Sequence, residues 1–324
     1  MLYLNKTQTV TIIATFVFLL IAAASMAVAA EKFPSKTVTV IIPFAAGGST
    51  DLGTRVLASI AEKNSGVPWI CKNVTGGAAV LGMEEMLRAK PDGYTIMMMT
   101  SNISLNKHLG LTKLSYEDYQ PILGVHSDYL ALVVRTGSPD KTLQDFLATA
   151  KQKRLKVQTG QAGGSMHIAL LALQDQLGVV FNIIPSQGGG GPATTALLGE
   201  HVDAIFTSVG SALSGINSGS FKVLAVLAPE RSNFLPDVPT VKELGYALNF
   251  ELARAYYAPK DTPKEIVAEL NAILTKAVQD ETFVKFVQNS GGELAYRNVE
   301  EVKKYLAWEL EAYKELLKAA NMLK

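Results

Sequence analysis

The residues best suited to bind a small molecule lie in turns where glycine precedes short polar side chains. In the stretch PFAAGGSTD, Gly47 and Gly48 can adopt backbone angles closed to other residues and let a ligand approach the main chain. Ser49, Thr50 or Asp51 can then cap a helix. The free N–H groups and positive dipole of a helix start bind a carboxylate or phosphate oxygen without a basic side chain. The alternative is an ordinary strand-to-helix turn, because one Gly-Gly pair is a weak signal.

Residues for catalysis or metal binding form no recognisable pattern in the sequence. The histidines His108, His126, His167 and His201 lack metal-ligand spacing, and Cys71 lies in an expected strand without a neighbouring histidine. The sequence has no Gly-x-Ser-x-Gly elbow, SQGGGGPATT lacks the Gly-Lys-Ser/Thr of a phosphate-binding loop, and GGSTD lacks dinucleotide spacing. We therefore expect a protein that is not an enzyme and has no metal and no cofactor.

The composition is that of a globular protein long enough for two domains. The chain has 324 residues, of which 48% are hydrophobic and 18% charged, and its formal net charge is +1. This balance argues against a nucleic-acid partner. Any recognition of an anion must therefore come from groups close to the binding site and not from the net charge of the protein. We also expect the protein to be a monomer.

The first 30 residues have the pattern of a secretory signal peptide. Lys6 precedes an apolar run from Val10 to Ala24, and small residues offer cleavage sites before Glu31. The run is shorter than the roughly 20 residues of a membrane-spanning helix, which disfavours the alternative of a retained anchor. Loss of Lys6 leaves equal numbers of basic and acidic residues. The mature chain is then expected to be periplasmic and freely soluble.

A buried strand, a glycine-rich turn and an amphipathic helix follow one another four times, at 38–60, 69–90, 156–177 and 181–198. Further strands are predicted at 94–99, 119–125, 129–135, 202–206, 222–227 and 250–258, and the chain is predicted to be helical from Lys264 to its end. Alternation of strands and helices predicts an α/β fold in which ligands bind at the carboxyl ends of the strands.

The four turns fall into two groups, which suggests two domains facing each other across a cleft. We expect domain 1 to comprise residues 31–127 plus 254–324 and domain 2 to comprise residues 128–253. Each domain would be a mixed sheet flanked by helices. The chain would cross between them near 126–134 and return near 247–257, and two crossings make a hinge.

An ordered series of motifs resembles the substrate-binding receptors of tripartite tricarboxylate transporters, the TctC or Bug family. PFAAGGSTDLGTR, NVTGGAAVLG, AKPDGYTIMM, GSMHIA, LLGEHVDAIF and LPDVPTVKELGY occur in the family's order over essentially the whole mature chain. The resemblance implies a periplasmic-binding-protein (Venus flytrap) fold and an exported receptor that closes on a small carboxylate and delivers it to membrane permease subunits.

The resemblance also implies a set of ligand-binding residues. The first domain would supply Phe44, Ala46, Gly47, Gly48, Ser49, Thr50, Asp51, Ser101 and Asn102. The second would supply Gly163, Gly164, Ser165, His167, Ser186, Gln187, Gly188, Thr207 and Ser208.

Two residues in this region, Asp51 and Arg254, carry a charge. A carboxylate repels a bound anion, so Asp51 is expected to cap its helix and pair with Arg55 one turn on, unless the ligand carries an ammonium group. In ARAYYAP, where many relatives have a tryptophan and a glycine, Arg254 is either a second, bidentate carboxylate contact or a structural interdomain arginine. The glycines at 188–191 leave the pocket size open.

Other functions remain alternatives at this point. A secreted α/β hydrolase or transferase is disfavoured because no nucleophile–base pair is evident in the sequence. A receptor that signals to a sensor kinase would carry the same motifs. The sequence does not identify the carboxylate, since backbone donors recognise only one end of it.

Overall fold

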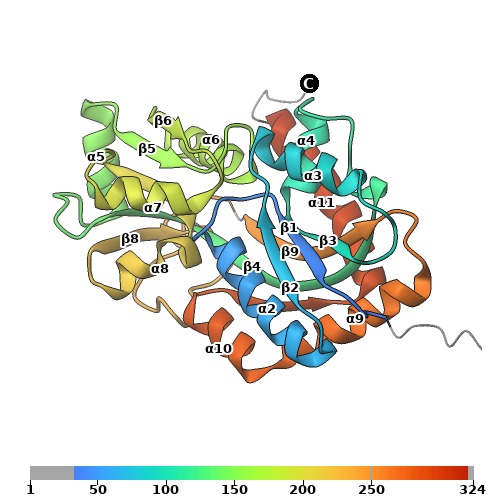
Figure 1. The fold of residues 1–324 in the computed structure, drawn as a ribbon. Coiled ribbons are helices and arrows are strands. Elements are labelled where there is room, and N and C mark those ends of the chain that lie inside the picture. Colours follow the sequence, from blue (N-terminus) through green and yellow to red (C-terminus); the bar gives the residue numbers. More distant parts are fainter. Residues whose placement is uncertain (1–32, 249, 320–324) are drawn as a thin grey trace, which may run out of the picture. The chain divides into compact units, whose positions relative to one another are not determined.

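The computed structural model describes residues 33–248 and 250–319, and the described residues from Lys36 onward form one unit. Its centre is a ten-stranded mixed sheet (Figure 1). Eight of the strands follow the order β2-β1-β3-β9-β4-β7-β5-β6, and the other two, β8 and β10, each pair with β4. Parallel pairs join β1 to β2 and β3, and β5 to β6 and β7, whereas β4 and β9 run antiparallel to their neighbours. The predicted mixed α/β fold is confirmed.

The strands are β1 (Val38–Ile42), β2 (Trp69–Asn73), β3 (Thr95–Thr100), β4 (Tyr119–Arg135), β5 (Lys156–Thr159), β6 (Asn182–Pro185), β7 (Ala204–Ser208), β8 (Phe221–Val226), β9 (Glu251–Pro259) and β10 (Glu293–Arg297). The α-helices are α2 (Ser49–Ser65), α3 (Val80–Leu87), α4 (Asn102–His108), α5 (Leu143–Gln152), α6 (Ser165–Leu177), α7 (Gly190–Leu198), α8 (Val209–Asn217), α9 (Lys264–Gln279), α10 (Glu281–Asn289) and α11 (Val299–Ala319).

Each of the four predicted strand–turn–helix units is present. They are β1 to α2, β2 to α3, β5 to α6 and β6 to α7. Helix α2 begins at Ser49 with Gly48 at the N-cap, so the prediction that Ser49, Thr50 or Asp51 occupies this position is wrong. Helices α6 and α7 likewise have glycines, Gly164 and Gly189, at their N-caps. A glycine N-cap has no side chain to accept from the first N–H groups, which leaves those donors available to other partners.

Strand β4 joins the two halves of the sheet. The two strands predicted at 119–125 and 129–135 are one strand of 17 residues, which pairs with β9 and β10 in one half and with β7 and β8 in the other. Its side chains alternate between two hydrophobic cores, with Leu130 and Leu132 in one and Ala131 and Val133 in the other. Burial on both faces explains the continuous apolar sequence YLALVV.

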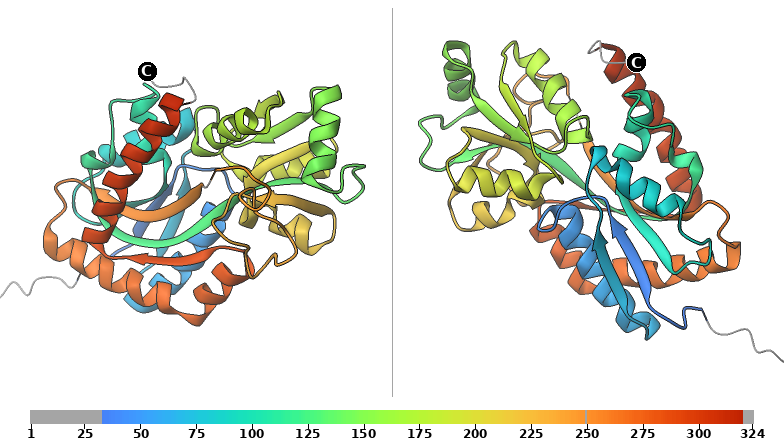
Figure 2. Two further views of the ribbon diagram at one scale, coloured as in Figure 1. Left: turned by 180° about the vertical axis from the view of Figure 1, so that it is seen from behind. Right: turned by 45° about the horizontal axis from the view of Figure 1, so that its top comes forward.

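Helices from both ends of the chain cover the half of the sheet that contains β1. Helix α2 packs against α9 and α10, and α11 packs against α4, so that C-terminal segments lie beside N-terminal ones (Figure 2). The prediction of helix throughout residues 264–324 is wrong at β10, which pairs antiparallel with β4. Trp308 on α11 is 62% exposed, so this aromatic does not pack in the core.

The predicted signal peptide lies outside the described residues. Among the helices of the described residues, none combines the length and the apolar character needed to cross a membrane.

Candidate functional site

A narrow cavity lies where the carboxyl ends of β1, β3, β5 and β6 lead into the following helices. It is lined by Phe44, Gly48, Ser49, Thr50, Thr100, Asn102, Gly160, Gln161, Gly164, Ser165, Met166, Gly188, Gly189, Gly190, Ser211, Leu252 and Arg254. Its volume is about 30 Å³, whereas one water molecule needs roughly 10–15 Å³ on the same measure. A small organic acid is larger than this space, so its entry requires the surrounding loops to move apart.

The first and fourth glycine loops touch through their backbones. The N–H of Ala45 donates to the carbonyl oxygen of Gly188 at 2.5 Å. Gly188 has a φ of +99° and a Cβ at this position would overlap Ala45, while a Cβ on Gly191 would lie 3.0 Å from the carbonyl oxygen of Ala46. Glycine is therefore required here both for the backbone angle and for the close approach of the two loops.

The first N–H groups of two helices are bonded to side-chain oxygens from the opposite half of the sheet. Ser49 N at the start of α2 donates to Ser211 Oγ, and Ser165 N at the start of α6 donates to Asn102 Oδ1, both at 3.1 Å. Both oxygens are neutral, although a helix N-terminus favours a negatively charged partner. The positions of these two oxygens are therefore places where a carboxylate oxygen is suited to bind.

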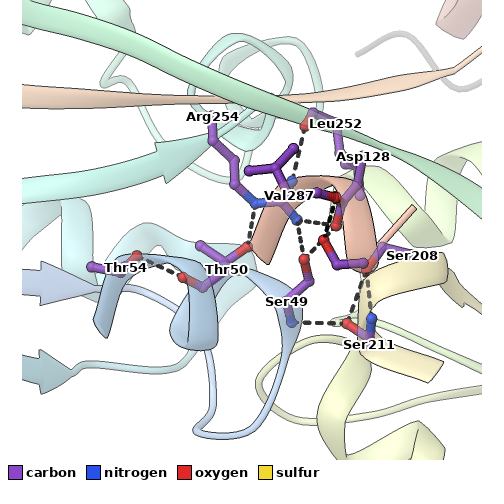
Figure 3. A network of polar contacts seen from close by, with 10 residues as sticks. Ser49, Thr50, Thr54, Asp128, Ser208, Ser211, Leu252, Arg254 and Val287 are labelled. Carbon is purple, nitrogen blue, oxygen red and sulfur yellow. Dashed lines mark hydrogen bonds and ion pairs between the residues drawn. The ribbon is translucent and has the colours of Figure 1, made fainter. Parts of the chain in front are cut away.

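A buried ion pair lies next to these donors (Figure 3). Arg254 Nη2 is 2.9 Å from Asp128 Oδ2, and both side chains are shielded from solvent. The hydroxyl of Ser49 donates to the same Asp128 oxygen, and Arg254 Nε donates to Thr50 Oγ1 at 3.1 Å. The network fixes the side chains of the first turn of α2 against β4 and β9, which carry Asp128 and Arg254.

Asp51 is not among the residues that line the cavity and pairs with Arg55, as the sequence suggested. The Arg55 side chain donates to both Asp51 oxygens, Asn73 donates at 2.8 Å, and the N–H of Gly47 donates at 3.0 Å. Burial alone would raise the pKa of Asp51, but the hydrogen bonds from Arg55, Asn73 and Gly47 together hold it below its ordinary value. Asp51 thus stays ionised while stabilising the turn before α2.

The sequence profile of the "Tripartite tricarboxylate transporter family receptor" matches residues 54–322 of the chain. The chain belongs to this receptor family. Protein BugT of Bordetella pertussis is 30% identical over 318 residues, which cover 96% of this receptor and 96% of BugT. The family consists of solute-binding receptors.

Solved structures of similar proteins have the same fold as this receptor. The periplasmic binding protein BugD superposes with a TM-score of 0.86 at 28% identity, over 90% of this receptor and 100% of BugD. MatC from Rhodopseudomonas palustris, solved with bound malate, superposes with a TM-score of 0.82 at 26% identity, over 88% of this receptor and 100% of MatC. The periplasmic-binding-protein fold expected from the motifs is confirmed.

The cavity brings together residues from both predicted groups in this receptor. The predicted residues that line it are Phe44, Gly48, Ser49, Thr50, Asn102, Gly164, Ser165, Gly188 and Arg254. The predicted residues outside its lining are Ala46, Gly47, Asp51, Ser101, Gly163, His167, Ser186, Gln187, Thr207 and Ser208.

Several of the residues outside the lining stabilise the loops around the cavity. His167 Nδ1 accepts from the N–H of Gly163 at 3.0 Å, and burial lowers the pKa of His167. Ser186 Oγ bonds within its own loop, and Ser208 Oγ accepts from Ser211 N at the start of α8. The Thr207 hydroxyl is buried, with no hydrogen-bond partner among the described residues. His167, Ser186 and Ser208 therefore support the geometry of the turns.

Sequence reasoning missed lining residues of two kinds. The first kind lies in or beside features that the sequence analysis recognised, so these residues could have been predicted from their neighbours in the sequence. They are Gly160, Gln161, Met166, Gly189 and Gly190 in the glycine-rich turns, and Thr100, which precedes Ser101 and Asn102. Ser211 and Leu252 carried no such signal, because helix α8 was not predicted and Leu252 lies in an apolar strand. In the part of the chain that the structure describes, no group of three His, Cys, Asp or Glu side chains could hold a metal ion.

Proposed function

We propose that this chain is a periplasmic receptor that binds a small carboxylate in the cavity described above and delivers it to the membrane subunits of a tripartite tricarboxylate-type transporter. Export would follow removal of residues 1–30, and the mature receptor would act as a monomer. The comparison that supports the ligand class is MatC, which has the same fold and was solved with bound malate.

One observation carries the proposal. Helices α2 and α6 start at opposite sides of the same cavity, and their first N–H groups donate to Ser211 Oγ and Asn102 Oδ1. A carboxylate has the charge that helix N-termini prefer and the two oxygens needed to replace such acceptors. Replacement of these cross-cavity contacts by ligand contacts would couple binding to movement of the loops.

The proposed movement is a hinge between two domains, residues 31–127 plus 254–324 and residues 128–253. The boundaries fall on β4 and β9, whose pairing has a register shift between Gly124 and His126. Such irregularities bend a sheet locally, which suits a hinge. The helices that begin at the cavity, α2 in the first proposed domain and α6 and α7 in the second, would then approach or separate as rigid bodies.

We further propose that the receptor has no catalytic activity. The thiol of Cys71 is half-buried, and this burial raises its pKa to about 11, so it stays protonated at neutral pH and is a poor nucleophile. In the described residues, the hydroxyl of Ser49 donates to Asp128, and the hydroxyl of Ser211 accepts from the N–H of Ser49, so neither of these serines is bonded to an imidazole.

A thermal-shift screen tests the proposal. Protein freed of solute by unfolding and refolding is melted with a panel of mono-, di- and tricarboxylates and aromatic acids. A ligand present at 100 times its dissociation constant adds about 2.7 kcal/mol to the free energy of unfolding. If no carboxylate in the panel raises the melting temperature, the proposed function is wrong.

Gly48→Val tests the location of the site. A Cβ on Gly48 would have ordinary contacts of 3.6 to 3.9 Å, so the variant is expected to fold, but its γ-methyl groups would fill the space at the start of α2. The matched control is Gly137→Val, because a Cβ there meets nothing within 4 Å. We expect loss of carboxylate binding in Gly48→Val alone, and equal binding by both variants would place the site elsewhere.

A further inference from the structure

Among the described residues that line the cavity, Arg254 is the only one with an ionisable side chain. All other lining residues are glycines, neutral polar residues or apolar residues. The charge close to a bound ligand therefore depends on Arg254 and on any acidic side chain that pairs with Arg254.

Asp128 neutralises Arg254. The two side chains are 0% and 1% exposed, and Nη2 of Arg254 lies 2.9 Å from Oδ2 of Asp128. Their strands are adjacent and antiparallel, with Arg254 paired to His126 and Asp128 paired to Leu252. The ring nitrogens of His126 have no hydrogen-bond partner among the described residues, and its buried imidazole is uncharged because its pKa is lowered to about 3. The cavity wall therefore has a formal charge of zero.

Attraction for an anion then comes from the starts of the helices. The first N–H groups of α2 and α6 can each bond one carboxylate oxygen, and the dipoles of α2, α6 and α7, which all begin at the cavity, add partial positive charge. The remaining wall includes the apolar side chains of Phe44, Met166 and Leu252. A second carboxylate would meet only such partial charges and no cation of its own, and burying its full charge in a small cavity is unfavourable.

We propose that Asp128 determines the charge class of the ligand, and that the receptor prefers a carboxylate with a single negative charge over a dicarboxylate of the same shape. This inference rests on the proposed function and narrows it. It assigns to Asp128, which does not line the cavity, a role in specificity through Arg254.

The test uses pairs of ligands that differ by one charge and almost nothing else. Malonate, succinate, glutarate and adipate are compared with malonamate, succinamate, glutaramate and adipamate by calorimetric titration at pH 7.5. For the chain length that fits best, the wild-type receptor is expected to bind the monoamide at least about tenfold more tightly than the dicarboxylate. This is the size of effect expected when one extra charge on the ligand has no opposite charge within a few ångströms.

Two variants locate the effect. In Asp128→Asn the charge of Arg254 is no longer cancelled, so the affinity ratio is expected to shift at least about tenfold toward the dicarboxylate. In the double variant Asp128→Asn/Arg254→Gln the cavity wall is neutral again, so this variant is expected to regain the preference for the monoamide. The double variant can be measured even if Asp128→Asn alone does not fold. Asp203→Asn removes an exposed carboxylate that bonds Lys156 N and should leave the ratio unchanged.

The outcomes separate the two proposals. Tighter binding of the dicarboxylate to the wild-type receptor, or an unchanged ratio in folded Asp128→Asn, overturns the role of Asp128 and leaves carboxylate binding intact. Failure of every member of the panel to bind overturns the proposed function itself.

Discussion

At the scale of single residues, side-chain chemistry was easier to predict than side-chain pairing. The Asp51–Arg55 pair could be read from spacing alone, because residues four apart share a helix face. Arg254 was recognised as unusual, but its partner was not, because Asp128 lies in the polar sequence HSD that looked like a break between two strands. Asp128 accepts a hydrogen bond from Arg254, which lies 126 positions further along the sequence, and local sequence patterns carry no information about such a pairing.

Two buried ionisable groups have opposite effects on stability in the same pH range. Burial and the positive charge of Arg254 lower the pKa of His126 to about 3, and burial raises the pKa of Glu309 to about 7. Between about pH 4.5 and 6.5 the unfolded chain protonates His126 while the folded chain does not, so stability rises with pH. In the same range the folded chain holds a proton on Glu309 that the unfolded chain releases, so stability falls with pH.

Removing either group should expose the effect of the other. Relative to wild type, His126→Leu is expected to gain about 2 kcal/mol in the free energy of unfolding as the pH falls from 6.5 to 5, and Glu309→Gln to lose about as much. Urea unfolding at the two pH values measures both changes. Each variant is the control for the other, and the same pH dependence in both would contradict the assignments.

At the scale of elements, the units with strong local signals were predicted and the long-range ones were not. Each of the four strand–turn–helix units has its apolar run and glycine turn in sequence, and each was found. Strand β4 was divided in two because polar residues interrupt its apolar pattern at positions that the sheet buries. Strand β10 was read as helix because it is a short, largely exposed strand that pairs with β4, which is distant in sequence.

The contact between glycine loops should be essential for ligand retention. Gly188→Ala would place a methyl group against Ala45 and also strain a φ of +99°. Gly219→Ala strains a φ of +71° but meets nothing within 4 Å, so it isolates the backbone effect. Both variants should lose about 1 kcal/mol of stability.

Only Gly188→Ala is expected to weaken ligand binding. A loss of about 1.4 kcal/mol from the state with touching loops raises the apparent dissociation constant about tenfold. Titration of both variants with the best ligand of the carboxylate panel measures this difference. Equal affinities would mean that the loops need not touch in the bound state.

At the scale of the whole molecule, the fold followed from the order of elements and motifs, but the conformation did not. Alternating strands and helices specify a doubly covered mixed sheet. Whether the loops at its carboxyl ends stand apart or touch depends on a few contacts such as Ala45 to Gly188, whose partners are far apart in sequence. The small cavity is a property of this closed arrangement, and no sequence pattern encodes its volume.

If binding closes a hinge, the receptor should become more compact in solution. Small-angle X-ray scattering of solute-free protein is expected to give a smaller radius of gyration after saturation with the best carboxylate. Gly48→Val, with its blocked site, provides the control and should show no change. An unchanged radius in saturated wild-type protein would argue against hinge closure.

The position of β4 at the middle of the sheet also affects how the chain can fold. Its longest pairing is with β9, and β3 likewise pairs with β9, so the adjoining strands β3, β9 and β4 cannot assemble until residue 259 has been synthesised. Pairing between segments so distant in sequence is slow, because loop closure comes before the contacts that reward it. The newly made chain therefore remains without its central strand pair during most of its synthesis.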